Sequence, residues 1–369
     1  MIIKREIKEK VENSLFNGKV IIIYGARRTG KTTLIKEIQA KFPGSNYLNC
    51  DEPSVRDALT NKGSLELKDY LGNNKLVFLD EAQRVKNIGL SLKLLVDNYP
   101  QMQVVATGSS SFELSNQVVE PLTGRKTEFY LFPFSWEELG AVYGEKKLDS
   151  LLEQRLIFGM YPEVVFQDQK NLEEIVRSYL YKDVLQYQGI KNPDILEKLL
   201  QALALQLGQE VSYNELAETV QIDKNTVRRY LEILQKAFVI FRLKAFSRNR
   251  RKEISKLRKI YFFDNGVRNA LIGNLNPLNL RQDVGSLWEN FLVSERLKSF
   301  RNKNEPVNQF FWRDYQQAEV DYLEENAGKL RGFEFKWKEK KYKQPKAFSD
   351  LYPEAAVELV HRNNYQKFL

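Results

Sequence analysis

The stretch GARRTGKTTL, Gly25–Leu34, decides the fold of the first part of this 369-residue chain. It meets the spacing G-x-x-x-x-G-K-T of a phosphate-binding loop, with Lys31 and Thr32 near its end. The apolar run VIIIY at 20–24 precedes it and is typical of a buried parallel strand, and apolar residues at helical spacing follow it. Backbone N–H groups at the start of such a helix attract phosphate. A strand, a glycine loop and a helix in this order predict a nucleoside triphosphate site.

The loop residues have different expected tasks. Lys31 is expected to reach the β- and γ-phosphates, and Thr32 to ligate Mg²⁺ through its hydroxyl group. Nothing in these residues selects the base of the nucleotide. The residues expected to bind the nucleotide are Gly25, Arg28, Thr29, Gly30, Lys31, Thr32, Thr33 and, from a later strand, Thr107.

A second apolar run, LVFL at 76–79, ends in Asp80 and Glu81. A carboxylate at the carboxyl end of a neighbouring buried strand is well placed to hold Mg²⁺, which is the task expected of Asp80. Glu81 is expected to polarise the attacking water as a general base. The alternative is a pair of acids that caps the following helix. Next to a phosphate-binding loop, the catalytic interpretation is favoured.

A third strand is expected at 104–106, and it runs into Thr107 and Ser109–Ser111. Hydroxyl groups there are expected to contact the γ-phosphate or the water, although polar residues follow strands of every kind. Arg125 comes shortly afterwards and has two open interpretations. It is a catalytic arginine that approaches the γ-phosphate, or it is a surface arginine paired with a carboxylate.

Composition narrows the class of protein. Hydrophobic residues make up 43% of the chain and aromatic residues 12%, so 369 residues are expected to form two or three folded domains. No apolar run approaches the ~20 residues of a membrane span. Residues 1–10 are charged and contain no apolar stretch of the kind expected in a signal peptide. The lone Cys50 and lone His361 exclude a disulfide framework and a Cys/His zinc site. A cytoplasmic protein with no membrane partner is expected.

The net charge of +9 points toward polyanionic partners. The densest basic run spans Arg242–Lys259, and another follows Lys336. The alternative for both runs is a solvated basic surface.

Periodicity divides the chain into three expected domains. Residues 1–142 alternate apolar strands with helical patterns, as expected for an α/β nucleotide-binding domain. Residues 143–255 are mainly helical. Strand patterns return in 256–369, where Phe333 and Phe335 alternate with charged residues.

Two short helices with a three-residue turn at 221–223 are expected in the middle domain. Ser212, followed three residues later by Glu215, fits a capping box at the start of the first helix. The second helix carries Lys224, Arg228 and Arg229. The pattern predicts a helix-turn-helix of winged type, which serves either DNA binding or protein docking.

Asp321, Glu334 and Lys336 form a second candidate site, with the spacing D-x₁₂-E-x-K. On adjacent strands the two acids would share a Mg²⁺, and Lys336 would orient water or stabilise a phosphorane-like transition state. Glu289, on a preceding helix, is expected to complete the acidic cluster. This is the constellation of the PD-(D/E)XK nuclease fold. The alternative is an ordinary strand whose charges face solvent.

As a set, the motifs resemble a family of bacterial and archaeal AAA-type ATPases that carry a C-terminal domain of unknown function. The resemblance implies a P-loop ATPase with a parallel sheet, then a helical and winged-helix segment, then an α/β restriction-nuclease-like domain. It also implies ATP as the nucleotide. The motifs are GARRTGKTTL, FLDEAQ (78–83), ATGSSS (106–111), LTGR (122–125), FPFSWEE (132–138), GMYPEV (159–164), KIYFFDNG (259–266), LWENFL (287–292), AEVDYL (318–323) and FEFK (333–336).

Three functions remain open at this point. The first is an ATP-hydrolysing molecular switch that acts on a partner, with DNA as the leading candidate. The second is an ATP-regulated, Mg²⁺-dependent nuclease. The third is an ATPase whose nuclease-like domain binds protein or nucleic acid without catalysis.

Overall fold

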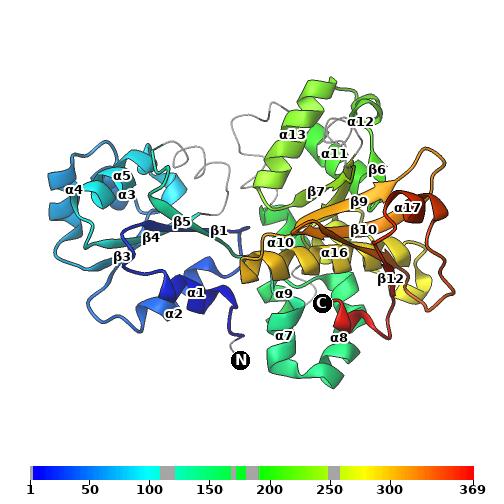
Figure 1. Ribbon diagram of the computed structural model, residues 1–369. Coiled ribbons are helices and arrows are strands. Elements are labelled where there is room, and N and C mark those ends of the chain that lie inside the picture. The colour runs from blue at the N-terminus through cyan, green and yellow to red at the C-terminus, as the bar shows by residue number, and fades with distance from the viewer. Residues whose placement is uncertain (1–2, 109–120, 168–171, 180–189, 191, 248–257) are drawn as a thin grey trace. The chain divides into compact units, whose positions relative to one another are not determined.

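The computed structural model describes residues 3–108, 121–167, 172–179, 190, 192–247 and 258–369 (Figure 1). The chain forms two compact units. The N-terminal unit consists mainly of residues 1–134, and the C-terminal unit mainly of residues 135–369. In the part of the chain that the structure describes, no helix combines the length and the apolar character needed to cross a membrane.

The N-terminal unit is built on a parallel sheet with the strand order β2-β3-β4-β1-β5 among the described residues. Every residue of β1, β3 and β4 is buried, which explains why these strands are continuous apolar runs. The strands are β1 (Val20–Tyr24), β2 (Asn46–Asn49), β3 (Leu76–Asp80), β4 (Gln103–Gly108) and β5 (Lys126–Tyr130). The predicted strands at 20–24, 76–79 and 104–106 are thus confirmed.

Helices connect the strands of this sheet. They are α1 (Ile7–Asn13), α2 (Lys31–Gln39), α3 (Pro53–Leu59), α4 (Ser64–Leu71) and α5 (Ile88–Asn98), with a 3₁₀ turn at Ala82–Arg84. Ile21, Ile23, Leu34, Phe78 and Val105 lie in the core between sheet and helices. Because the strands are parallel, the carboxyl ends of β1, β3 and β4 meet at one edge of the sheet.

The C-terminal unit contains a mixed sheet with the order β12-β11-β10-β9-β7-β8-β6 in the described residues. Its strands are β6 (Glu210–Val211), β7 (Ile240–Ala245), β8 (Arg258–Phe262), β9 (Asn308–Arg313), β10 (Glu319–Asn326), β11 (Lys329–Phe335) and β12 (Val357–Val360). The β7–β9 and β11–β12 pairs are parallel, and the other pairs are antiparallel.

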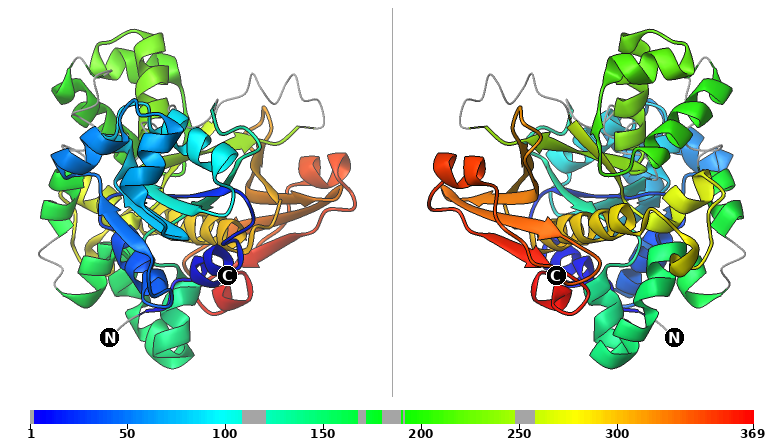
Figure 2. Two further views of the ribbon diagram at one scale, coloured as in Figure 1. Left: turned by 90° about the vertical axis from the view of Figure 1, so that its left-hand side faces the viewer. Right: turned by 90° about the vertical axis from the view of Figure 1, so that its right-hand side faces the viewer.

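The helices of the second part of the chain precede, interrupt and follow these strands. They are α7 (Trp136–Tyr143), α8 (Glu145–Phe158), α9 (Pro162–Phe166), α10 (Leu172–Tyr179), α11 (Pro193–Leu205), α12 (Tyr213–Val220), α13 (Lys224–Lys236), α15 (Asn265–Leu271), α16 (Val284–Lys303) and α17 (Lys346–Leu351), with 3₁₀ turns at Leu278–Leu280 and Tyr365–Lys367. The long helix α16 runs along the sheet (Figure 2), and its Asn290 exchanges hydrogen bonds with the backbone of Phe262 in β8.

One sheet joins segments that the sequence assigned to two domains, 143–255 and 256–369. Strand β7 pairs with β8 on one side and with β9 on the other, through Lys244↔Phe310 and Ala245↔Phe311. The local pattern shows each strand but not its partner, so the periodicity gave no sign that the segments share a core.

A buried polar network also holds the helices of this unit together. Asp264 caps α15 by accepting a hydrogen bond from the backbone N–H of Val267 at 3.1 Å, and it accepts a second from that of Met160 at 2.7 Å. Gly159 lies so close that a Cβ atom there would stand 2.0 Å from Asp264 Oδ1. At the other end of the network, Glu295 accepts a hydrogen bond from the N–H of Trp136 at 2.6 Å.

Candidate functional site

The phosphate-binding loop joins β1 to α2. A Cβ atom on Gly25 would lie 2.3 Å from the carbonyl oxygen of Leu131, so this position requires glycine. Arg28 and Gly30 adopt positive φ angles of 63° and 96°. Left-handed residues among right-handed ones turn successive N–H groups toward one side, which makes an anion-binding concavity. The loop conformation therefore suits a phosphate.

Lys31 is almost fully buried at the start of α2. Its Nζ donates hydrogen bonds to the carbonyl oxygens of Gly25 at 3.0 Å and Ala26 at 2.9 Å. A lysine ammonium has three N–H donors, and here two are directed at the loop itself. The positive charge thus lies inside the turn that would enclose the phosphates.

Asp80, at the end of β3, gathers three hydroxyl groups. Oδ2 accepts hydrogen bonds from Thr32 Oγ1 at 2.6 Å and from Tyr47 Oη at 2.9 Å, and Oδ1 accepts one from Thr107 Oγ1. The carboxylate is buried. Sequence reasoning named Asp80, Thr32 and Thr107, and it missed Tyr47, whose position on the neighbouring strand β2 gave no signal.

Glu81 begins the turn after β3 with a positive φ of 55°. Its backbone N–H donates to Thr107 Oγ1 at 3.2 Å, and its Oε2 accepts a hydrogen bond from Gln83 Nε2 at 2.5 Å. Gln83 therefore fixes the direction of the Glu81 carboxylate. The residue lies within the quoted motif FLDEAQ, but its spacing alone assigned it no task.

Arg5 is a further residue at the loop that sequence reasoning missed. It is buried, and its Nη1 and Nη2 donate hydrogen bonds to the carbonyl oxygens of Thr29 at 2.7 Å and Phe132 at 2.6 Å. Its guanidinium carbon lies 4.7 Å from the centre of the Phe134 ring. Arg5 thus ties the phosphate-binding loop to the segment that follows β5.

Asp321, Glu334 and Lys336 come together at the second candidate site. Lys336 Nζ lies 2.6 Å from Glu334 Oε1 and 3.8 Å from Asp321 Oδ2. Asp321 Oδ2 also accepts a hydrogen bond from the N–H of Phe335 at 2.8 Å. Glu334 Oε2 is buried and has no hydrogen-bond partner within the described ranges. Burial and the charge of Asp321 raise the pKa of Glu334. An unpartnered carboxylate oxygen beside a second carboxylate fits a divalent cation.

Glu289 does not join this pair, which corrects the expected acidic cluster. Its Oε1 accepts hydrogen bonds from Lys259 Nζ at 2.9 Å and from Tyr261 Oη at 2.6 Å. The buried Lys259 also pairs with Glu319. Throughout the described ranges, no three acidic, histidine or cysteine residues form a group able to hold a metal. A lysine ammonium already neutralises Glu289, so a metal at the second site would depend on Asp321 and Glu334 alone.

Three family models match successive parts of the chain. The first is an AAA domain, matched by residues 17–140. The others are domains of unknown function, DUF8612 over residues 149–278 and DUF4143 over residues 284–368. An uncharacterized protein of Mycobacterium tuberculosis is 28% identical over 345 residues, which cover 91% of this chain and 74% of its own length. Another, from Methanocaldococcus jannaschii, is 28% identical over 342 residues, covering 86% and 74%.

Among solved structures, the chain is similar to the Walker-type ATPase of Pyrococcus abyssi. The similarity covers 73% of this chain and 96% of that one, with a TM-score of 0.50 and 18% identity. Residues 17–140 therefore form an AAA-type domain. The models that match the rest of the chain assign it no activity, so the chemistry of the second site rests on its residues.

Arg125 of the AAA-type domain is the last residue of the turn that leads into β5. Its Nε is 2.5 Å from Asp97 Oδ1, and both side chains are more than a third exposed. The structure therefore matches the surface ion pair, one of the two interpretations left open above. Thr33 lies in the first turn of α2. Ser109–Ser111 lie outside the described residues.

Beyond the AAA-type domain, the predicted pair of helices is present as α12 and α13, joined by residues 221–223. Ser212 Oγ accepts a hydrogen bond from the N–H of Glu215 at 3.4 Å, which supplies one half of the expected capping box. Lys224, Arg228 and Arg229 are exposed on α13. Most of the basic run Arg242–Lys259 lies outside the described residues.

Proposed function

We propose that this chain is an ATP-hydrolysing molecular switch that acts on a partner through its C-terminal unit. The observation that carries the proposal is the contact of Asp80 with both Thr32 and Thr107, because it joins the loop helix and two strand ends around one carboxylate. Lys31 would bind the phosphates at the loop. Thr32 and Asp80 are oxygen donors of the kind that Mg²⁺ prefers, so they would hold the ion. When bound, Mg²⁺ would neutralise charge on the phosphates.

Glu81 is the proposed general base. A general base must lie within hydrogen-bond reach of the water it activates, and its carboxylate must be held in a defined direction. Gln83 holds Oε2 of Glu81, and the other carboxylate oxygen would take the proton of the water. Thr107 connects Glu81 to Asp80, so the base and the metal ligand share one support.

Paired substitutions test these assignments. Lys31→Ala is expected to weaken ATP binding by about 100-fold or more, because a charge-assisted contact to phosphate is lost. Glu81→Gln is expected to keep ATP binding and to lower kcat by about 100-fold or more. Lys41→Ala, at an exposed lysine just after α2, is the matched control. Calorimetry would measure ATP binding, and phosphate release would measure hydrolysis. Unchanged ATP affinity in Lys31→Ala would contradict the proposal.

The unpartnered oxygen of Glu334 favours a second candidate function, a Mg²⁺-dependent nuclease regulated by ATP. Asp321 and Glu334 would hold the ion, and Lys336 would stabilise charge on the phosphate. Cleavage of linear, circular and single-stranded DNA would be assayed with Mg²⁺ or Mn²⁺, with and without ATP. Lys336→Ala is expected to abolish cleavage, whereas Lys338→Ala, at an exposed lysine two residues on, is expected to preserve it.

The absence of cleavage with ATP hydrolysis intact would favour the third alternative, a nuclease-like domain that binds without catalysis. Two observations support DNA as the partner. The order α11-β6-α12-α13-β7-β8 fits the predicted winged helix, and Arg228 and Arg229 are exposed on α13. Each phosphate contact steepens the salt dependence of affinity by ~0.9 in log–log slope. The double substitution Arg228→Ala/Arg229→Ala should flatten that slope by about 2, and an unchanged slope would point to a protein partner.

A further inference from the structure

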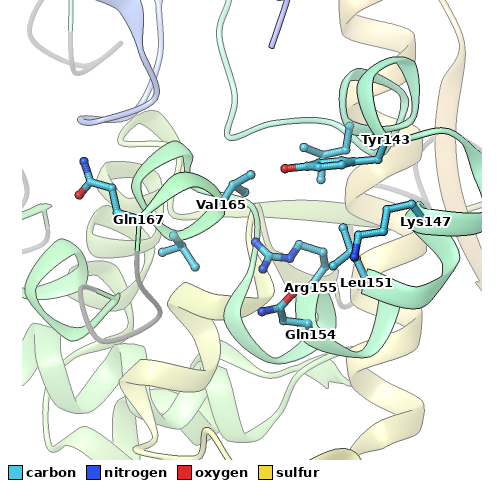
Figure 3. A pocket seen from close by; sticks show the side chains of 9 residues that line it. Tyr143, Lys147, Leu151, Gln154, Arg155, Val165 and Gln167 are labelled. Atoms are coloured by element: carbon cyan, nitrogen blue, oxygen red, sulfur yellow. The ribbon is translucent and has the colours of Figure 1, made fainter. Parts of the chain in front are cut away.

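Helices α7, α8 and α9 enclose a pocket of about 280 Å³ in the C-terminal unit. Helix α8 lines it with one face, because Lys147, Leu151 and Arg155 follow one another at intervals of four residues. Leu139, from α7, and Val165, from α9, add apolar wall. Figure 3 shows Arg155 among these side chains, with the ring of Tyr143 across the pocket. The residues that line the pocket do not include Asp321 or Glu334.

Arg155 is a buried cation with few partners. The residue is only 5% exposed. Its Nη1 donates a hydrogen bond to the carbonyl oxygen of Gly159 at 3.2 Å. Its Nε is buried and has no hydrogen-bond partner among the residues that the structure describes. In the described parts of the chain, no carboxylate lies within ion-pair distance of its guanidinium group.

A buried charge without a counter-charge is costly. Burial lowers the pKa of Arg155, against weaker opposing effects of Asp264 and Tyr143. The described side chains that line the pocket include Lys147 as a second cation and no carboxylate. The charge balance of the pocket therefore favours an anion, which would supply a counter-charge at ion-pair distance.

We propose that this pocket binds a small organic anion. A carboxylate, sulfonate or phosphate group would accept hydrogen bonds from Arg155, with Lys147 adding positive charge at the rim. An apolar or aromatic body would lie against Leu139, Leu151 and Val165. The volume is close to the lower end of the range of small-molecule sites, about 300–1,000 Å³, which limits the ligand to the size of one or two rings.

Two fluorescent probes of similar shape test the proposal on the full chain. The first is 8-anilinonaphthalene-1-sulfonate, and the second is N-phenyl-1-naphthylamine, which lacks the sulfonate. The wild type is expected to bind one equivalent of the sulfonate about tenfold or more tightly than the neutral probe, because a hydrogen bond to a charged group contributes about 1.5–3 kcal/mol. Arg155→Met is expected to abolish this preference.

Two further variants and a control test the proposal even if Arg155→Met fails to fold. Leu151→Trp should fill the pocket and weaken both probes by about tenfold. Lys147→Ala should weaken the sulfonate alone, by a few-fold, while Lys146→Ala, at an exposed lysine outside the pocket, should leave it unchanged. Equal affinity of the wild type for the two probes, or sulfonate binding that survives both Arg155→Met and Leu151→Trp, would overturn the proposal.

Discussion

Arg5 shows at the scale of one residue how a position outside the phosphate-binding motif can govern it. A guanidinium group offers five donors in a rigid fork, so it can serve two carbonyl oxygens at once. Those of Thr29 and Phe132 belong to segments that are about a hundred residues apart in sequence. Lysine has one nitrogen and no such fork, so it would not replace Arg5.

We therefore expect Arg5→Lys to raise the KM for ATP by about tenfold, since an unsatisfied carbonyl and a looser loop cost about 1–3 kcal/mol, while kcat changes less. The neighbouring Lys4→Ala removes an exposed ion pair with Glu9 and is expected to leave KM unchanged. Steady-state ATP hydrolysis measures both constants. A variant with normal KM and reduced kcat would show that Arg5 does not position the loop.

Also at the scale of one residue, Glu289 is expected to make the stability of the fold depend on pH. Burial raises the pKa of its carboxyl group from 4.5 to about 7, with Asp321 adding to the effect and Lys259 opposing it. The folded state therefore holds a proton that the unfolded chain releases near pH 4.5. This contribution to stability is fully present below pH 4.5 and is lost as the pH rises through about 7.

Glu289→Gln is expected to flatten the pH dependence of the free energy of unfolding between pH 4.5 and 7, by at most about 3 kcal/mol over that window. Denaturant unfolding across this range measures the slope. Glu145→Gln, at an exposed acid at the start of α8, is the control and should keep the wild-type slope. Identical slopes in all three proteins would contradict the assignment to Glu289.

At the scale of elements, two glycines with positive φ angles lie at the ends of helices: Gly144 between α7 and α8, and Gly159 after α8. Their surroundings differ. Gly144 and Gly159 have φ angles of 71° and 74°, but a Cβ atom on Gly144 would meet open space, whereas one on Gly159 would strike Asp264. Asp264 caps α15, so the close approach at Gly159 joins the end of α8 to the start of α15. The two positions separate backbone strain from packing.

Gly144→Ala is expected to destabilise the fold by about 1–3 kcal/mol, because a φ of 71° with a ψ of 159° is a backbone conformation almost confined to glycine. Gly159→Ala adds a clash and disturbs the Asp264 cap, so it should cost about 3 kcal/mol or more. Chemical denaturation of both variants gives the difference directly. Equal losses of stability would mean that the contact between α8 and α15 adjusts to the extra Cβ atom with no loss of free energy of unfolding.

The sequence patterns indicate the individual strands and helices more clearly than they indicate which residues contact one another. The buried parallel strands of the N-terminal unit are apolar throughout, and the loop residues are set by local geometry, so both were readable in the sequence. Tyr47 and Arg5 were missed because each acts through a tertiary contact. Glu289 was misplaced for the same reason: Lys259 reaches it from a strand thirty residues away in sequence. Gln83 acts on Glu81, two residues before it, but its spacing alone gave it no task.

At the scale of the whole molecule, strand β7 decides which parts of the chain fold together. It pairs with both β8 and β9, so the sheet runs through the 255/256 boundary suggested by periodicity. A fragment that begins at residue 256 would lack β7 and expose the edges of β8 and β9. Exposed strand edges promote aggregation.

We expect the fragment 135–369 to be folded and monodisperse, because it retains the sheet in full. The fragment 256–369 is expected to be insoluble or to unfold without a cooperative transition. Gel filtration and thermal unfolding monitored by circular dichroism distinguish these outcomes. A cooperative, monomeric 256–369 would show that β9 to β12 fold without the preceding strands.

The position of β7 also bears on how such a chain changes over generations. Recombination can exchange a segment of a gene only where both resulting parts of the protein still fold. A boundary between β7 and β8 would divide one sheet, so it does not meet this condition. The helix pair α12 and α13 and the strands after residue 256 must therefore be inherited as one piece. Change in what this protein recognises would have to arise by substitution on its surfaces, and not by trading its last third for another.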